Sequence, residues 1–257
     1  MTDRRPSSNR DWEKWGEIDP LWAVSTSPGK HSGGAAPWTD EEFYAAGQAA
    51  WEKYLVRWRR YGLDPASCVE IGCGAGRLTK HMAATFLRIA ALDVSPAMLA
   101  YAKKHVPDPR VTFLLAAGDT IPLADASVSA AFSTYVFQHF DTLAHATAYF
   151  GEIARVLRPG GTMLIQQPVH AWPWDRGVFE WLHRVVSVGD DARVWVRRKL
   201  VPLGVRPPMR GLSYGQQYVF ETLHAVGLED VEVASHLAPG QRSSQQLVLA
   251  RKPLAAR

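Results

Sequence analysis

Short apolar strands alternate with helices from Ser67 to Gln167, and this alternation constrains the fold more than any other feature of the sequence. Such a βαβ rhythm predicts a parallel, doubly wound α/β sheet with right-handed crossovers. The strands are expected at Ser67–Ile71, Leu87–Leu92, Val111–Ala116, Ser127–Tyr135 and Thr162–Gln167, and the helices at Gly76–Thr85, Pro96–Lys104 and Asp141–Leu157.

A glycine-rich run lies where the first strand meets the first helix. Within Val69–Arg77, glycines alternate at positions 72, 74 and 76. Residues without side chains let the backbone turn tightly and let a ligand approach it closely, while the helix N-terminus offers free N–H groups. A glycine-rich turn alone is common, but its position between a strand and a helix favours a nucleotide site.

Acidic residues follow the second and third strands. Asp93 ends the second strand about 20 residues after the first glycine, where an acid can accept both hydroxyls of a ribose. Gly118 and Asp119 follow the third strand, where a carboxylate could reach an adenine amino group. Each acid alone would be read as a solvated loop residue or a helix cap. At three successive strand ends, the features together predict one nucleoside site.

These segments resemble the class I S-adenosylmethionine-dependent methyltransferases. The glycine run is similar to that family's E-x-G-x-G-x-G pattern, with Glu70 as its acid. Leu92–Leu99 resembles the ribose-binding segment, Gly118–Leu123 the adenine-side segment, and Val156–Thr162 the turn into the fifth strand. The resemblance implies S-adenosylmethionine as cofactor and S-adenosylhomocysteine as product. It also implies a Rossmann-like, mostly parallel seven-stranded sheet with one antiparallel strand.

The resemblance is close over residues 68–167 and looser towards the C-terminus, where a helix is expected near Gly215–Val226 and strands near Glu229–Ser235 and Gln245–Arg251. The expected reaction is methyl transfer to oxygen or nitrogen of a small-molecule metabolite, with secondary metabolism as a candidate setting. The expected cofactor-binding residues are Glu70, Gly72, Cys73, Gly74, Gly76, Asp93, Val94, Met98, Gly118, Asp119, Thr120, Thr134, Tyr135, Trp22 and Phe43.

Two other functions fit part of the pattern. A nicotinamide-dependent oxidoreductase shares the strand, the glycine turn and the ribose acid, but its fingerprint is G-x-G-x-x-G. Arg77 occupies the place of the third glycine of that fingerprint, and the Gly118–Asp119 segment has no role in it. The second alternative is a module that binds the cofactor without catalysing a reaction.

Methyl transfer to a hydroxyl usually needs a base with a pKa near the working pH. Two histidines follow strands at the expected crevice: His139 after the fourth and His170 after the fifth. Either is a candidate base. His139 could instead hold its loop in place, and His170 could be an exposed loop residue.

Residues 1–61 are expected to form an arm and a lid, and residues 62–257 the core, with an insertion at 170–213 as a substrate cap. Residues 1–40 predict an irregular arm with one short helix, and the acids that follow Thr39 predict a helix over 40–61. The arm is expected to fold over the cofactor. Alternatively, Trp51 and Trp58 pack on the sheet while Trp12 and Trp15 meet another subunit in a homodimer. Six of the ten tryptophans precede the core: Trp12, Trp15, Trp22, Trp38, Trp51 and Trp58.

Composition argues against several partners. The net charge is only +4 and basic residues are interspersed with acids, so nucleic acid is not expected. Cys68 and Cys73 read as small apolar residues, neither disulfide nor metal site, which suits the cytoplasm. No signal peptide or membrane helix is expected. Residues 178–200 could lie on a membrane or bind an anion, although a lid or dimer contact explains them as well.

Overall fold

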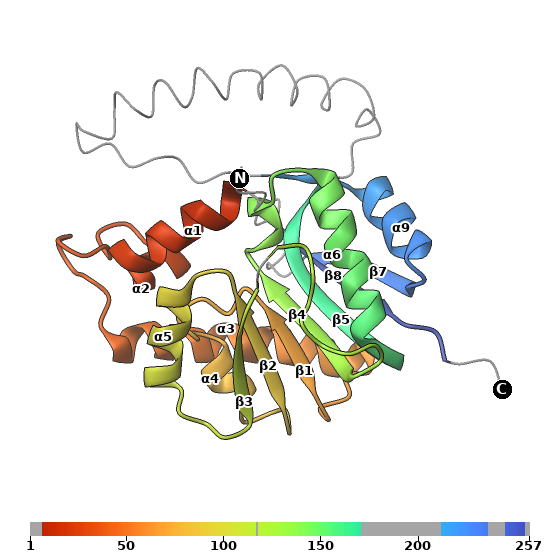
Figure 1. Ribbon diagram of the computed structural model, residues 1–257, viewed down its shortest axis with the longest axis horizontal. Helices are drawn as coiled ribbons and strands as arrows, with labels where there is room; N and C mark the ends of the chain where they lie inside the picture. Colours follow the sequence, from red (N-terminus) through yellow and green to blue (C-terminus); the bar gives the residue numbers. More distant parts are fainter. Residues whose placement is uncertain (1–6, 117, 171–211, 236–244, 255–257) are drawn as a thin grey trace, which may run out of the picture.

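The structure is a computed structural model that describes residues 7–116, 118–170, 212–235 and 245–254 (Figure 1). The described residues form an eight-stranded sheet, in which seven strands follow the order β3-β2-β1-β4-β5-β8-β7 and the short strand β6 pairs with β5 off this path. The strands are β1 (Cys68–Ile71), β2 (Ile89–Asp93), β3 (Val111–Leu115), β4 (Val128–Thr134), β5 (Leu157–His170), β6 (Tyr214–Gly215), β7 (Glu229–Ser235) and β8 (Gln245–Arg251).

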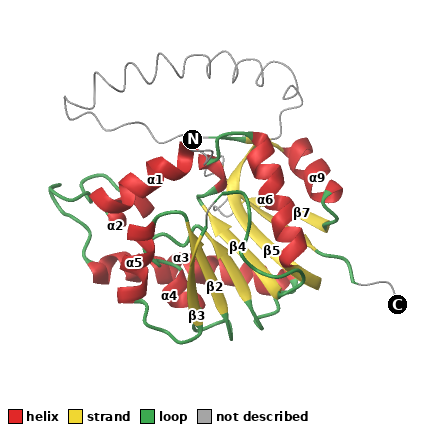
Figure 2. Ribbon diagram, viewed as in Figure 1, coloured by secondary structure: helices red, strands yellow, loops and turns green. Residues whose placement is uncertain are grey.

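Helices cover both faces of the sheet (Figure 2). The described helices are α1 (Ser7–Ile18), α2 (Pro20–Val24), α3 (Asp40–Tyr61), α4 (Thr79–Met82), α5 (Pro96–His105), the 3-10 helix η1 (Phe137–His139), α6 (Leu143–Val156) and α9 (Gln216–Ala225). The predicted helix at 76–85 shortens to α4, because the residues around it form turns. The arm contains two helices where the sequence predicted one.

From β1 the chain adds β2 and β3 on one side and then β4 and β5 on the other. The strand order therefore reverses between β1 and β4. Strands β1 to β5 run parallel to one another, while β8 lies antiparallel to both β5 and β7. The predicted Rossmann-like sheet with one antiparallel strand is confirmed. In such sheets, ligands bind in the crevice at the carboxyl ends of the strands where the order reverses. The fold therefore directs attention to the ends of β1 and β4.

Alternating side chains on each strand divide the core between the two faces. Ala131, Met163 and Ile165 pack under α6 and α9 on one face. Ala130, Phe132 and Leu164 pack against α3 and α4 on the other. Because the side-chain period of a strand is two residues, a run of apolar residues in β4 and β5 serves both faces at once.

Two of the arm's tryptophans belong to the sheet core. The indole of Trp58 stacks on Phe132 with ring centroids 5.7 Å apart, and Trp51 meets the same ring edge-on at 5.3 Å. The indole N–H of Trp58 donates to Oγ1 of Thr162 at 2.9 Å, which satisfies its buried polar atom. Trp51 and Trp58 therefore pack on the sheet, as the alternative reading of the arm expected.

The rest of the arm joins a separate core cluster with α5. Trp15 of α1 and Ala23 of α2 are buried together with Phe43, Met98 and Val106. Figure 1 shows α1 and α2 beside α5 at one end of the sheet. The arm is thus part of the folded core.

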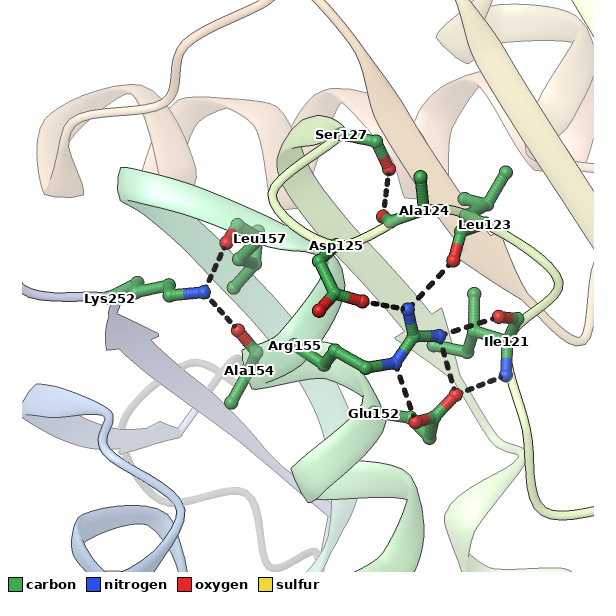
Figure 3. A network of polar contacts seen from close by, with 10 residues as sticks. All are labelled: Ile121, Leu123, Ala124, Asp125, Ser127, Glu152, Ala154, Arg155, Leu157 and Lys252. Carbon is green, nitrogen blue, oxygen red and sulfur yellow. Dashed lines mark hydrogen bonds and ion pairs between the residues drawn. The ribbon is translucent and has the colours of Figure 1, made fainter.

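Arg155 of α6 holds the segment that follows β3 (Figure 3). Its guanidinium donates to the carbonyls of Ile121 and Leu123 at 2.8 Å and pairs with Asp125 at 2.7 Å. Glu152 binds the same guanidinium and accepts from the backbone N–H of Ile121 at 2.7 Å. These contacts fix Ile121 and Leu123, which lie at the end of the predicted adenine-side segment Gly118–Leu123.

Some predictions fall where the structure gives no description. Apart from its ends, the insertion predicted at 170–213 lies outside the described residues, and so does all of the segment 178–200. In the part of the chain that is described, no helix is long and apolar enough to cross a membrane.

Candidate functional site

A cavity of about 410 Å³ opens at the carboxyl ends of β1, β2 and β4, where the strand order reverses. Both the sheet loops and the N-terminal arm form its wall. The lining residues of the core are Ile71, Gly72, Gly74, Arg77, Leu92, Asp93, Val94, Met98, Ala116, Thr134, Tyr135, Val136, Gln138, His139, Phe140 and Tyr149, and those of the arm are Ser8, Asn9, Trp12, Ala23, Val24, Ser25, Thr26 and Ser27.

The glycine loop bends back across the end of β2. The backbone N–H groups of Gly72 and Cys73 both donate to the carbonyl of Leu92 at 2.8 Å. Gly72 and Gly74 adopt φ values of 76° and 52°, a region that favours glycine. A Cβ at Gly72 would lie 2.2 Å from Val136, and one at Gly74 would lie 2.6 Å from Val24. Both positions therefore require glycine for backbone conformation and for space.

Asp93 connects the two strand ends that form the floor of the cavity. Its Oδ2 accepts from the backbone N–H of Gly74 at 2.8 Å, and its Oδ1 accepts from that of Ser95 at 2.9 Å. Burial raises the pKa of this carboxyl, while the backbone hydrogen bonds act in the opposite direction. Carboxylate oxygens have further lone pairs, so this fixed group can also accept hydroxyl donors from a ligand.

Three residues of the glycine motif that are expected to contact the cofactor lie outside the cavity wall. Glu70 is buried below the loop, where its Oε2 accepts from the Thr79 hydroxyl at 2.6 Å. Cys73 packs in the core cluster beneath α3. Gly76 packs close to Ala102 of α5. These residues shape the loop and its neighbouring helices.

The predicted adenine-side residues adjoin the cavity without lining it. The hydroxyl of Tyr149, a lining residue, donates to the carbonyl of Gly118 at 2.8 Å. His145 of α6 places its Nε2 3.2 Å from Oδ1 of Asp119. Burial lowers the pKa of His145 and Asp119 opposes that shift. The wall at this end is formed by Ala116 and Tyr149, while Asp119 and Thr120 lie next to it in sequence.

The arm reaches the cavity through other residues than those predicted. Trp22 packs against Trp15 with ring centroids 5.3 Å apart, and Phe43 is fully buried in the arm cluster. Neither lines the cavity, and their contact with the cofactor stays a prediction. Trp12 of α1 and Val24 of α2 take that position.

The end of β4 supplies the residues of the opposite wall. Thr134 and Tyr135 line the cavity as predicted, and Tyr135 is 40% exposed with a φ of 59°. Non-glycine residues in this region cost conformational energy and cluster at functional sites. A strained, accessible aromatic residue at the cavity therefore suits contact with a ligand.

Of the two candidate bases, His139 lies at the cavity and His170 does not. The His139 side chain is buried, and its ring meets that of Trp12 edge-on with centroids 4.9 Å apart. Its Nε2 lies 3.1 Å from the side-chain amide nitrogen of Gln138. His170 ends β5 and pairs through its backbone with Gly215 of β6.

Sequence reasoning missed several lining residues, among them Arg77, Asn9 and Trp12. Arg77 was noted only because it replaces a glycine of a different fingerprint. Its place directly after the glycine loop was a usable signal, since a side chain at the mouth of a helix can face the ligand. Asn9 carried no such signal, because its place in the site depends on how the arm folds.

The methyltransferase domain family matches residues 69–165, which contain the glycine loop, Asp93 and the end of β4. Residues 69–165 form a class I S-adenosylmethionine-dependent methyltransferase domain. The cofactor of this family is S-adenosylmethionine, and the site fits it. Gly72 and Gly74 present backbone without side chains at the cavity wall, and Asp93 holds a buried carboxylate beside them.

Relatives and solved structures agree with this assignment. Over 112 residues the chain is 36% identical to a malonyl-[acyl-carrier protein] O-methyltransferase of Hahella chejuensis, a match that covers 43% of this chain. It covers 39% of that relative, so the chain spans about two fifths of its length.

The fold is similar to that of solved structures whose alignments cover nearly the whole chain. The N-methyltransferase NodS of Bradyrhizobium japonicum, solved with S-adenosylhomocysteine, superposes with a TM-score of 0.58 at 15% identity over 96% of this chain and 98% of NodS. The [4+2]-cyclase SpnF gives 0.60 at 18% identity over 98% of each chain. At such identities the likeness concerns the fold alone, and a cyclase among these structures shows that the fold does not determine the reaction.

Proposed function

We propose that this chain transfers the methyl group of S-adenosylmethionine to an oxygen or nitrogen atom of a small-molecule acceptor. The observation that carries the proposal is a cavity whose wall is formed by the loops of the sheet and by the N-terminal arm. Asp93 and Met98 line the part suited to the nucleoside, and Trp12 and His139 line the part left for an acceptor. Methyl transfer requires donor and acceptor in one water-poor space.

When bound, S-adenosylmethionine supplies a sulfonium methyl group and a good leaving group, so the displacement needs mainly alignment of the reacting atoms. Asp93 and the glycine loop would hold the nucleoside at one end. The arm would cover the cavity with apolar side chains, because Trp12, Ala23 and Val24 lie in its wall. Such a cover removes water from the reacting atoms.

His139 is the proposed base when the acceptor is a hydroxyl. It follows β4 directly through η1, so the sheet fixes its backbone, and Trp12 restrains its ring from the other side. A neutral imidazole nitrogen can take the proton that the hydroxyl loses as the new bond to carbon forms. An amine that arrives deprotonated needs no such base, and His139 would then only line the acceptor site.

The match to the malonyl carrier methyltransferases covers less than half of either chain. The class of acceptor is therefore inferred from the size of the cavity. Its volume of about 410 Å³ is in the usual range for sites that bind small molecules.

A labelling experiment tests the proposal. The purified chain is incubated with methyl-labelled S-adenosylmethionine and a panel of phenols, alcohols, amines and carboxylic acids. We expect label in one acceptor class with an equal amount of S-adenosylhomocysteine formed. Tight cofactor binding with no transfer to any class would favour the alternative of a binding module without catalysis.

A further inference from the structure

Arg77 presents an unusual charge to the cavity. It lines the wall directly after the glycine loop and is mostly buried. Among the described residues, its buried Nε has no hydrogen-bond partner. A buried N–H donor without an acceptor is costly, because its desolvation is not offset by a hydrogen bond. The arrangement indicates that something absent from the protein itself completes the site.

Among the described residues, no hydrogen bond or ion pair joins the side chain of Arg77 to the groups that act on its charge. Glu70, Tyr54 and Tyr135 are the titratable groups that act on its charge. Burial raises the pKa of Glu70 to about 7, and its carboxyl already accepts from Thr79. Burial also raises the pKa of Tyr54, whose neutral hydroxyl donates to Oε1 of Gln166 at 2.6 Å.

A second buried donor without an acceptor belongs to Gln166, the residue that accepts the hydrogen bond from Tyr54. Gln166 is fully buried, and its Nε2 has no hydrogen-bond partner among the described residues. In the sheet, Gln166 is the register partner of Thr134, which lines the cavity. Gln166 is thus a second buried donor without an acceptor in the described part of the chain, while Asp93 is the carboxylate of the described wall.

We propose that Arg77 binds a carboxylate inside the cavity, either the methionine carboxylate of the cofactor or a carboxylate of the acceptor. This inference rests on the proposed function. A guanidinium offers parallel N–H donors that match the two oxygens of a carboxylate. A bare guanidinium near the sulfonium would repel its positive charge, and a carboxylate between them removes that repulsion. The wall then carries a carboxylate for the ribose and a guanidinium for the carboxylate of the ligand.

The test uses Arg77→Gln with Arg88→Gln as its matched control. Arg88 is exposed at the start of β2, at the opposite end of the strand from Asp93, so the control removes the same charge away from the cavity. Calorimetry measures the affinities of S-adenosylhomocysteine and of methylthioadenosine, which lacks the amino-acid part. A third titration adds malonate to protein saturated with S-adenosylhomocysteine.

The two possible sources of the carboxylate, the cofactor and the acceptor, predict different results in these titrations. If Arg77 holds the cofactor's carboxylate, Arg77→Gln weakens S-adenosylhomocysteine roughly 10- to 100-fold and leaves methylthioadenosine unchanged. If it holds the acceptor's carboxylate, both nucleosides bind normally and malonate binding is lost. Arg88→Gln should match the wild type throughout.

The inference is overturned if Arg77→Gln matches the wild type in all three titrations, or if it weakens both nucleosides equally. Such results leave the proposed function intact, because the wild type still binds its cofactor. Failure of the wild type to bind either nucleoside would overturn the proposed function itself.

Discussion

The carboxylate of Asp93 accepts a hydrogen bond from the backbone N–H of Gly74 at 2.8 Å. The acid at the end of β2 thereby holds the glycine loop at the end of β1, and both residues line the cavity. Two motifs that lie 19 residues apart in sequence are thus one structural unit. A ligand that binds to either the glycine loop or Asp93 would therefore depend on both.

Asp93→Ala should weaken S-adenosylhomocysteine binding more than Asp119→Ala. Asp93 lines the cavity and can accept two ribose hydroxyls, so its loss should cost roughly 10- to 100-fold in affinity. Asp119 adjoins the cavity and is about half exposed, so its loss should cost less. Calorimetry on both variants gives the comparison. Equal and negligible effects would show that the nucleoside site is placed wrongly.

Trp12→Ala and Trp22→Ala should separate the two functions of the arm. Trp12 lines the cavity and contacts His139, so its loss should lower kcat/KM with little effect on Tm. Trp22 packs on Trp15 away from the cavity, so its loss should lower Tm and leave cofactor affinity unchanged. Thermal unfolding, calorimetry and steady-state kinetics measure these effects. If Trp12→Ala kept full activity, the arm would not cover the reaction site.

His139→Gln should lower kcat on the order of 10²- to 10⁴-fold if the acceptor is a hydroxyl, because the base is lost while the cofactor contacts stay. His170→Gln is the control, since His170 does not line the cavity. The affinity for S-adenosylhomocysteine should be unchanged in both variants. Near-normal turnover of His139→Gln across the pH range would mean that alignment alone supports the reaction.

Glu70 should make the folded state less stable as the pH rises. Burial raises its pKa to about 7 from an ordinary 4.5, so the folded state binds the proton more tightly than the unfolded state. The free energy of unfolding should therefore fall between about pH 5 and pH 8, by on the order of 3 kcal/mol from this group.

Glu70→Gln should remove that part of the pH dependence, because the amide does not titrate and its oxygen can still accept from Thr79. Denaturant unfolding at several pH values measures the difference. Parallel curves for the wild type and the variant would show that the carboxyl of Glu70 titrates alike in both states.

Local sequence signals were enough to predict the sheet and part of the cavity wall. Glycine at 72 and 74 and the acid at 93 act through their own backbone conformation and strand position, so pattern alone located them. The same holds for the helix at 40–61, whose Thr39 and Glu42 form a capping box in the structure.

The remainder depends on tertiary contacts that no local pattern encodes. Trp12 and Trp22 lie in neighbouring helices, and the packing of α1 and α2 on α5 decides which of them faces the cavity. Glu70 and Cys73 belong to the motif, yet the alternation of the strand and the turn of the loop direct them into the core.

The central claim is that the cavity between the glycine loop, Asp93 and the arm binds S-adenosylmethionine. Isothermal titration of the whole chain with S-adenosylhomocysteine and, separately, with NADH tests it most directly. The account predicts saturable one-to-one binding of S-adenosylhomocysteine, weakened by Asp93→Ala, and no binding of NADH. Tight binding of NADH with no response to S-adenosylhomocysteine or S-adenosylmethionine would contradict it.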